Sequence, residues 1–435
     1  MRISASSGRG GCDRRAFLRI GSAGLLGLTL PKMLQLEGEG ATRMTGGTHE
    51  RATGVILIWL QGGPSTIDMW DMKPEAPEEV RGTFRPVATA LPGVQVCEHL
   101  PRLAQILNRV TLVRSLHHVI NDHGAGAKYV LTGRLPSATA EAPSLGSLAA
   151  ALLPPADGIP AFITVGLGSS IGAGQLGPAY GPLRVDLQAG PPQLEGLTLP
   201  KIFPVAALED RERLRRRLDQ SLAELDSSGL PAELDRFQQQ ALDILRADKT
   251  RRALDVGAER PAVQAEYGYS TVGRGALAAC RLIEAGARFV TLGTGDWDTH
   301  GSSHFRNLRD ELLPSLDQAL SALITDLDRR GLLARTIVYC VGEFGRTPRL
   351  NVAGGRDHWP GSMATILAGG GFQRGYVHGA TDRLGTEPRL NPCTPQDVAA
   401  TIFHRLGFEP THRLATLRDA SVFPEGRVLK PLLTT

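Results

Sequence analysis

Cysteine is scarce in this 435-residue sequence, which contains five. The four that lie beyond residue 33 are Cys97, Cys280, Cys340 and Cys393. Their spacings form neither a metal-binding knuckle nor a disulfide framework, which argues against a zinc-knuckle or disulfide-held protein. Cys280 stands in an apolar helical pattern and Cys340 in an apolar strand pattern, so we expect buried thiols.

Long apolar runs and a net charge are also absent once the first 33 residues are set aside. No later segment is apolar for long enough to cross a bilayer, so we expect no stable membrane span. Residues 1–33 hold six of the 48 Lys and Arg and one of the 44 Asp and Glu, which leaves 42 basic and 43 acidic residues. The basic excess of the whole chain therefore comes from its N-terminal segment. It gives no reason to expect a nucleic-acid partner.

That N-terminal segment reads as a twin-arginine export signal. Arg14 and Arg15 stand side by side, and an uncharged, Gly-rich stretch follows from residue 20 to residue 30. This order is typical of substrates of the twin-arginine translocon, and the stretch is too short for a permanent anchor. The alternative is a disordered basic tail beside a short core helix. We expect a signal in residues 1–33, a mature start between residues 34 and 48, and a periplasmic or extracellular protein.

The remaining chain reads as one large α/β domain over residues 54–430, preceded by a flexible lead-in over 34–53. Residues 55–60 form a continuous apolar run that ends at Gly62-Gly63, which is typical of a central strand in a covered, mostly parallel sheet. The same pattern predicts further strands over 110–113, 162–165, 288–292, 336–341 and 365–368.

Helical periodicity separates these strands and predicts a doubly wound α/β fold with helices on both faces of the sheet. The predicted helices cover residues 100–108, 145–153, 275–285, 308–329 and 395–406, the last with Thr394 as its N-cap. Residues 208–256 are highly charged and predict a helical insertion or cap. Its charges favour a solvated face over a site for an anionic partner. In such folds chemistry gathers at the carboxyl ends of the strands.

The strongest chemical signal follows the predicted strand 288–292. Asp296, Asp298, His300 and His304 lie within nine positions on a loop that leads into a helix. Zn²⁺ and Mn²⁺ accept such mixed nitrogen and oxygen ligands. The alternative is a helix-capping Asp with two surface histidines.

Three further polar clusters follow predicted strands and would converge on the same edge of the sheet. They contain Asp122 and His123, then Glu343 and Arg346, and then Arg356, Asp357 and His358. A strand-end Glu can also be a helix cap, and an Arg can fork onto phosphate or sulfate. Together the clusters predict a divalent metal site, with zinc or manganese favoured and calcium as an alternative.

These motifs resemble the domain-of-unknown-function 1501 family, whose members are exported by the twin-arginine route and grouped with alkaline phosphatases and sulfatases. The matching strings are residues 60–65, 68–74, 297–300, 343–348 and 355–360. The resemblance implies an alkaline phosphatase-like fold with its site at the strand ends.

The superfamily resemblance also implies positions for individual residues. Asp296 and His300 match its D-x-x-x-H metal signature, Glu343 its late strand-end acid, and His358 its last histidine. Two places depart from the pattern. Gln61 stands where the superfamily has a metal-binding acid, with Asp68 and Asp71 further on, and His123 stands where it has its Ser, Thr or modified Cys nucleophile. The formylglycine motif C-x-P-x-R is also missing, and Cys393 begins only a weak imitation of it.

The sequence thus favours an exported, metal-dependent hydrolase of small-molecule or polysaccharide phosphate or sulfate esters, acting through a metal-bound hydroxide. Asp298, His300 and His358 would form the core of the metal site, completed by Glu343 and by His123 or His304. Arg346 or Arg356 would hold the anion.

The alternative is an exported binding or assembly protein that keeps the fold and has lost catalysis. The missing nucleophile favours that alternative, and the retention of several ligand-type residues disfavours it. A glycosidase with two carboxylates is a more distant third, against which the histidine content argues.

Overall fold

A computed structural model of the chain describes residues 51–137, 141–166, 171–186, 248–409 and 422–434. The expected signal, nearly all of the lead-in and residues 208–247 of the expected insertion lie outside the described residues. Ala52, at the end of the expected lead-in, is 1% exposed. Its backbone nitrogen donates to the carbonyl of Arg405 at 3.0 Å, so this end of the expected lead-in packs against the domain.

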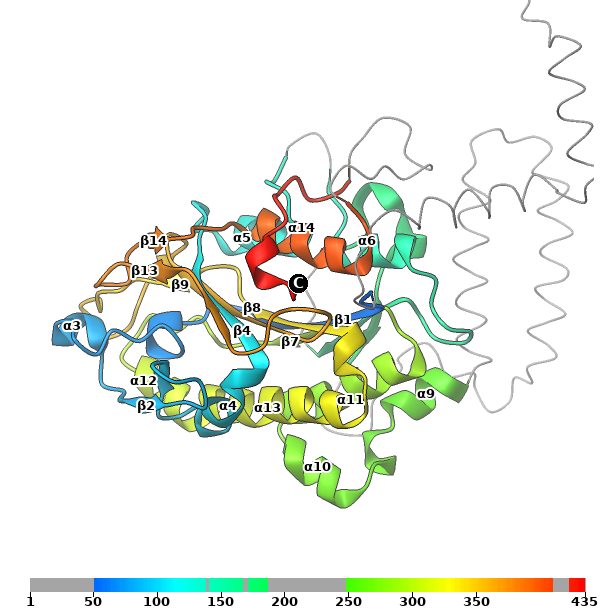
Figure 1. Ribbon diagram of the computed structural model, residues 1–435, viewed down its shortest axis with the longest axis horizontal. Coiled ribbons are helices and arrows are strands. Elements are labelled where there is room, and N and C mark those ends of the chain that lie inside the picture. Colours follow the sequence, from blue (N-terminus) through cyan, green and yellow to red (C-terminus); the bar gives the residue numbers. More distant parts are fainter. Residues whose placement is uncertain (1–50, 138–140, 167–170, 187–247, 410–421, 435) are drawn as a thin grey trace, which may run out of the picture. The chain divides into compact units, whose positions relative to one another are not determined.

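The core is an eight-stranded sheet in the order β12-β4-β11-β8-β1-β7-β5-β6 (Figure 1). Its strands are β1 (Gly54–Leu60), β4 (Val110–Leu116), β5 (Phe162–Gly166), β6 (Leu183–Val185), β7 (Phe289–Thr294), β8 (Thr336–Val341), β11 (Met363–Ala368) and β12 (Tyr376–His378). β11 runs antiparallel to β4 and β8, and every other pairing in this sheet is parallel. The six predicted strands and the mostly parallel α/β class are confirmed.

The direction of β11 differs from the parallel arrangement that its apolar run suggests. Between β8 and β11 the described chain forms only loops and a small ribbon, β9 (Gly345–Arg346) with β10 (His358–Trp359). A parallel return needs a crossover across a face of the sheet, and this connection contains no helix for it. β11 therefore starts at the edge where β8 ends, which brings residues 342–362 to that edge.

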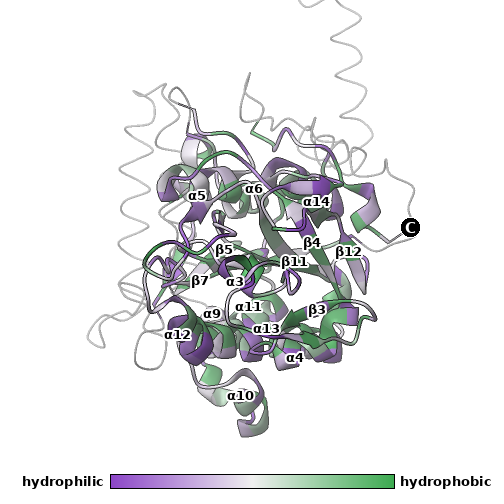
Figure 2. Ribbon diagram, turned by 90° about the vertical axis from the view of Figure 1, so that its left-hand side faces the viewer, coloured by the Kyte–Doolittle hydropathy of each residue, from purple (hydrophilic) through white to green (hydrophobic). Residues whose placement is uncertain are grey.

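Helices cover both faces of the sheet because the central strands are apolar on both faces (Figures 1 and 2). In β1 the side chains of Ile56 and Ile58 pack into one hydrophobic cluster, and those of Leu57 and Trp59 into the other. The first cluster includes α4 (Pro101–Ile106), α9 (Asp248–Leu254), α10 (Pro261–Tyr267), α11 (Thr271–Ala285) and α13 (Leu313–Arg329). The second includes α5 (His123–Thr132), α6 (Leu145–Leu152) and α14 (Pro395–Leu406).

The predicted helices are present, with α14 capped as expected. Thr394 and Asp397 form a reciprocal capping box at its start. Predicted helix 308–329 is a π-helical turn over Leu308–Leu312 followed by α13, and a short helix α12 (His304–Asn307) comes directly before it. The remaining short elements are α3 (Glu78–Arg81), β2 (Pro86–Ala88), β3 (Gln95–Cys97), β13 (Ala380–Thr381) and β14 (Pro388–Leu390).

Two expectations from composition can be compared with this part of the chain. Cys97, Cys280, Cys340 and Cys393 are free and buried, as predicted. Among the described residues, none of the helices has both the length and the apolar content that a bilayer crossing requires.

Candidate metal centre

The loops after β1, β7 and β8 and the loop before β11 press closely together at one edge of the sheet. Gly62, just after β1, has φ +114°, and a Cβ there would lie 2.5 Å from the backbone nitrogen of Asp298. A Cβ on Gly355 would lie 2.2 Å from the carbonyl carbon of His300. Since real Cβ atoms do not approach other atoms so closely, glycine at both positions lets the loops meet.

Asp298, His300 and His358 are in mutual contact at this edge. Oδ1 of Asp298 lies 2.8 Å from Nε2 of His300 and 3.3 Å from Nε2 of His358. The two Nε2 atoms are 3.0 Å apart. His123, the first residue of α5, brings its Nε2 within 3.4 Å of Oδ2 of the same carboxylate. The structure therefore groups the three residues expected to form the core of a metal site and adds His123 to them.

Carboxylates hold two of these imidazoles from behind. Nδ1 of His123 lies 2.7 Å from Oε1 of Glu343, and Nδ1 of His300 lies 2.9 Å from Oδ1 of Asp357. A carboxylate accepts, so each Nδ1 can donate its hydrogen to the carboxylate behind it; when such a ring is neutral, its Nε2 is an acceptor that can bind a metal. Asp357 and Glu343, both expected as ligands, thus lie beside the imidazoles and fix their orientation.

The third imidazole is held by the backbone. Nδ1 of His358 lies 2.8 Å from the carbonyl oxygen of Asn121. A carbonyl only accepts, so this nitrogen also carries the hydrogen. In all three rings Nδ1 faces an acceptor, and the three Nε2 atoms lie within 3.4 Å of the carboxylate of Asp298. Metal-bound histidines in proteins are oriented by such outer partners.

The donor set fits a divalent metal. One ligand atom each from His123, Asp298 and His358 lie within 4.8 Å of one another. Ligands around a tetrahedral zinc, bound at about 2.0–2.1 Å, are roughly 3.3 Å apart, which matches the contacts in this group. Oε2 of the buried Glu343 has no hydrogen-bond partner among the described residues. A cation bound between the imidazole nitrogens and the carboxylate of Asp298 would offset the repulsion between these electron-rich atoms. A set of imidazole and carboxylate ligands suits zinc or manganese better than calcium.

Arg346 supplies the buried positive charge of the group. Its side chain is fully buried, and its guanidinium donates to several acceptors. These are the carbonyls of Gly62, Gly63, Trp297 and Arg356, Nε2 of His300, and Oδ1 of Asp298. Burial would raise the pKa of Asp298, but the hydrogen bond and charge of Arg346, with the charges of His300 and His123, lower it to about 2. The Arg346 donors are all engaged within the protein, so it stabilises the Asp298 carboxylate and does not extend toward an external anion.

His304 and Arg356 lie outside this group. Both side chains are completely buried, and both contact the carboxylate of Asp68. Arg356 also donates to the carbonyls of Val80, Thr347 and Pro348. His304, expected as a ligand, and Arg356, expected to hold the anion, therefore both pair with a buried carboxylate in the protein interior.

Two more of the predicted residues are exposed beside the group. Asp122 is the N-cap of α5, and its carboxylate accepts from the backbone nitrogen of Ala125 at 2.8 Å. Asp296 has a left-handed backbone, with φ 69°, in the turn that leaves β7. Among the described residues its side chain has no ion pair or hydrogen bond to the group. Within the described part of the chain, neither carboxylate has a hydrogen bond or ion pair with the histidines of the group.

Sequence reasoning missed Asn351. Its side-chain nitrogen donates to the carbonyl of His300 and to Oδ1 of Asp357, both at 3.0 Å. Its side-chain oxygen accepts from the backbone nitrogens of Ala353 and Gly355. The only sequence signal was an Asn that opens a Gly-Gly turn, a common arrangement in ordinary loops. Its position beside Asp357 became apparent only from the structure.

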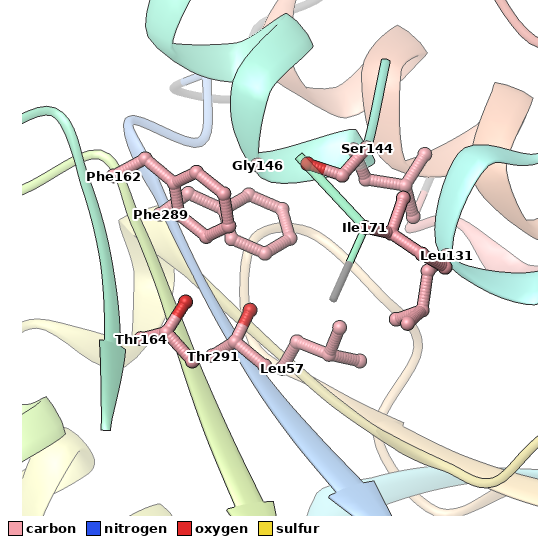
Figure 3. A pocket seen from close by; sticks show the side chains of 10 residues that line it. Leu57, Leu131, Ser144, Gly146, Phe162, Thr164, Ile171, Phe289 and Thr291 are labelled. Atoms are coloured by element: carbon pink, nitrogen blue, oxygen red, sulfur yellow. The ribbon is translucent and has the colours of Figure 1, made fainter. Parts of the chain in front are cut away.

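An apolar pocket lies elsewhere, between α6 and strands β1, β5 and β7 (Figure 3). Figure 3 shows the rings of Phe162 and Phe289 side by side and the hydroxyls of Thr164 and Thr291 on the strand side. Its lining residues are Leu57, Leu131, Ser144, Leu145, Gly146, Phe162, Thr164, Ile171, Phe289 and Thr291. It shares none of them with the polar group and contains no group that titrates near neutral pH, so it offers no acid–base chemistry.

The fold and this group together define a doubly wound α/β protein with a candidate metal centre at the carboxyl edge of its sheet. The chain belongs to the family described as "Protein of unknown function (DUF1501)", whose sequence profile matches residues 52–433. This confirms the family resemblance of the motifs. No curated protein matches the sequence.

Several solved structures are similar over most of the chain at low identity. The PsFucS1 sulfatase from a Pseudoalteromonas species is 11% identical, with a TM-score of 0.41 over 92% of this chain and 76% of that one. A phosphonate monoester hydrolase from Silicibacter pomeroyi is 11% identical, with a TM-score of 0.36 over 88% and 76%. The PH0037 protein from Pyrococcus horikoshii is 11% identical, with a TM-score of 0.33 over 84% and 100%. Likeness this distant carries no inference about activity.

Proposed function

We propose that this protein is an exported, metal-dependent hydrolase of phosphate or sulfate esters. The observation that carries the proposal is the convergence of three imidazole Nε2 atoms on Asp298, each ring held at Nδ1 by an acceptor. Orientation by outer partners is what a metal site requires, and an ordinary surface histidine does not need it.

Four residues would hold the ion: His123, Asp298, His300 and His358. A bound divalent metal would polarise an ester oxygen and lower the pKa of a coordinated water toward about 7. Zinc or manganese suits these ligands best, with calcium as the alternative. Glu343 and Asp357 keep the hydrogens of their imidazoles on Nδ1, away from the ion.

The anionic substrate would bind directly at the ligand group. His123, His300 and Asp298 have side chains 40%, 41% and 44% exposed, so the centre is open to a small molecule or to one unit of a polysaccharide. The guanidiniums of Arg346 and Arg356 are buried and engaged, so neither can fork onto phosphate or sulfate in this conformation.

The reaction would proceed by direct attack of water, without a covalent enzyme intermediate. Residues 121–128 contain no Ser, Thr or Cys. His123 starts α5, where the superfamily places its nucleophile, and its Nε2 faces Asp298 at 3.4 Å. A lone pair given to a metal cannot also attack phosphorus or sulfur, so His123 fits the role of a ligand better than that of a nucleophile.

Export through the twin-arginine translocon is part of the proposal and rests on Arg14, Arg15 and the uncharged stretch that follows. Proteins that fold before export can receive their metal in the cytoplasm. A metal centre assembled from loops far apart in the sequence, as here, would benefit from that order of events.

Elemental analysis of the protein purified from its native compartment, followed by turnover of nitrophenyl phosphate and nitrophenyl sulfate, tests the proposal. We expect about one or two equivalents of zinc or manganese, loss of turnover on chelation, and recovery with the same metal. An isotopically chiral phosphate ester should be hydrolysed with inversion. A metal-free protein that shows no turnover with Zn²⁺, Mn²⁺ or Ca²⁺ would contradict the proposal, and retention of configuration would contradict direct attack.

The second candidate is a binding or assembly protein that has lost catalysis on the same fold. The imidazole in the place of the superfamily nucleophile favours it. Under this alternative the protein still binds metal and anion but releases no product from either ester.

A further inference from the structure

A single buried carboxylate, that of Asp68, joins three of the loops at the edge where the candidate metal centre lies. It belongs to the 3₁₀ turn Thr66–Asp68 that follows β1, and its side chain is completely buried. Oδ2 accepts from Nε2 of His304 at 2.8 Å and from Nε of Arg356 at 2.7 Å. Oδ1 accepts from Nη2 of Arg356 at 2.8 Å, so the guanidinium binds in a bidentate manner.

The first of these partners leads to the loop after β7. Nδ1 of His304 lies 2.6 Å from Oγ1 and 3.1 Å from the carbonyl of Thr299. Thr299 stands between Asp298 and His300, two of the four proposed ligands. Asp68 contacts His304, and His304 contacts Thr299, so the carboxylate is linked by two successive contacts to the backbone that carries Asp298 and His300.

The second partner leads to the loop before β11. Arg356 is adjacent to Asp357, which holds His300, and is two residues before His358. The backbone nitrogen of Arg356 also donates to the carbonyl of Thr299, so the two loops touch at this point. The contacts of Asp68 with His304 and Arg356 thus converge on the segment that positions His300. Its third partner, the hydroxyl of Ser65, donates to Oδ2 at 2.6 Å from within the same turn.

The charge of Asp68 fixes the geometry of this arrangement. Burial opposes its ionisation, but the charge of Arg356 and the hydrogen bond and charge of His304 hold its pKa well below the usual range. A buried ion pair of this kind contributes little net stability but fixes geometry, because separating its partners would leave an unpaired charge in the interior.

We propose that Asp68 is a positioning residue of the metal centre, which sets the separation between the loop of Asp298 and His300 and the loop of Asp357 and His358. This inference rests on the proposed metal site. Asp68 makes no direct contact with any of the four proposed ligands. Its effect on metal binding is exerted through His304 and Arg356.

The chain contains a matched control for the loss of a buried carboxylate. Asp326 in α13 is 1% exposed and accepts from Nη2 of Arg329 at 2.7 Å, Nε of Arg330 at 2.9 Å and the hydroxyl of Tyr267 at 3.0 Å. None of these partners belongs to the loops at the metal edge. Asp326→Asn should therefore destabilise the fold in a comparable way without altering metal binding.

The experiment compares Asp68→Asn, Asp326→Asn and the unmutated full-length protein. Titration calorimetry with Zn²⁺ alone should give an affinity lowered about 10–100-fold in Asp68→Asn, as for other outer partners of metal sites, and an unchanged affinity in Asp326→Asn. The visible absorption spectrum with Co²⁺ alone should change only in Asp68→Asn, because the ligand geometry is altered. Equal effects of the two substitutions, or no effect of Asp68→Asn, would overturn the inference.

Hydrogen exchange of the metal-free proteins separates this inference from the proposed function. Asp68→Asn should speed exchange in residues 297–304 and 354–359 together, and Asp326→Asn should leave both segments as they are. If the unmutated protein binds no metal, the proposed function fails while this measurement still decides the role of Asp68. Should Asp68→Asn not fold, His304→Gln keeps the Asp68–Arg356 pair and should speed exchange in 297–304 alone. Unchanged exchange in that variant would contradict the inference.

Discussion

Oε1 of Glu343 lies 2.7 Å from Nδ1 of His123, across 220 residues of sequence. The same oxygen accepts from the backbone nitrogen of Gly62 at 2.8 Å. One carboxylate at the end of β8 therefore orients the imidazole that opens α5 and fixes the turn that follows β1. Because Glu343 is 2% exposed, water cannot readily replace either contact.

We expect Glu343→Gln to lower zinc affinity about tenfold or more, since outer partners of metal-bound histidines typically contribute 10–100-fold. The amide can still accept the hydrogen bond from Gly62, but it lacks the negative charge that strengthens Nε2 of His123 as a metal ligand. Titration calorimetry with Zn²⁺ measures the change. Glu284→Gln removes the charge of a surface carboxylate that pairs with Arg330 far from the site, so it is the control and should leave affinity unchanged. Identical zinc affinities in the two variants would show that Glu343 does not contribute to metal binding.

His300→Ala and His358→Ala should each reduce bound metal markedly, because either change opens the ligand group. Elemental analysis after gel filtration measures occupancy. His404→Ala is the control, since this histidine lies on α14, pairs with Glu409 and is outside the group. Full occupancy in both test variants would show that the metal site is placed wrongly.

Asp298 predicts a specific acid dependence of stability in the metal-free protein. Its pKa is lowered from 3.8 to about 2 in the folded state, so the folded protein releases this proton more readily than the unfolded chain. Its stabilising contribution is therefore complete above about pH 5 and is lost as pH falls through about 2. Denaturant midpoints in the presence of chelator should show Asp298→Asn less stable than the unmutated protein at pH 6. That difference should shrink between about pH 4 and pH 2, and a constant difference would contradict the assignment.

Cys393→Ala should leave any esterase activity intact. Burial raises the pKa of this thiol to about 12, and its Sγ lies 3.9 Å from the hydroxyl of Ser115. It is therefore a protonated, inaccessible group, unlike a reactive cysteine. Turnover of nitrophenyl sulfate measures the effect. An inactive Cys393→Ala protein of normal thermal stability would point to chemistry at Cys393.

Changing both Arg14 and Arg15 to Lys should keep the protein in the cytoplasm, because the twin-arginine route reads the arginine pair. Fractionation and immunoblotting measure its location. Arg9→Lys is the control within the same basic segment and should be exported normally. Export of the double variant at the normal level would contradict the localisation.

The sequence was sufficient where a local pattern has one physical reading. The run from Val55 to Leu60 is apolar on both faces, and a strand of that kind must be covered on both sides, as β1 is. Thr394 followed by Asp397 predicts a capped helix start, and α14 begins there with the full capping box. The histidines and the carboxylate that follow these strands were identified because chemistry in such folds gathers at strand ends.

It was insufficient where identical residue types have different partners. His300 and His304 are four residues apart in the sequence, yet His300 joins the half-exposed group, and His304, the first residue of α12, is buried against Asp68. Arg346 and Arg356 read from the sequence as anion-binding residues. Their N–H groups instead donate to carbonyls and carboxylates of the protein itself. Only the packing of the loops determines these partners.

What the sequence by itself determined is the family, the α/β class, the edge of the sheet at which the polar residues gather, and the expectation of export. Periodicity and strand-end chemistry are local, so they can be read from neighbouring residues. The tertiary structure decided which of those residues face one another and in which orientation. It also decided the antiparallel course of β11 and the three anchored Nδ1 atoms, because contacts between residues 57 to 237 positions apart depend on how the whole sheet is assembled.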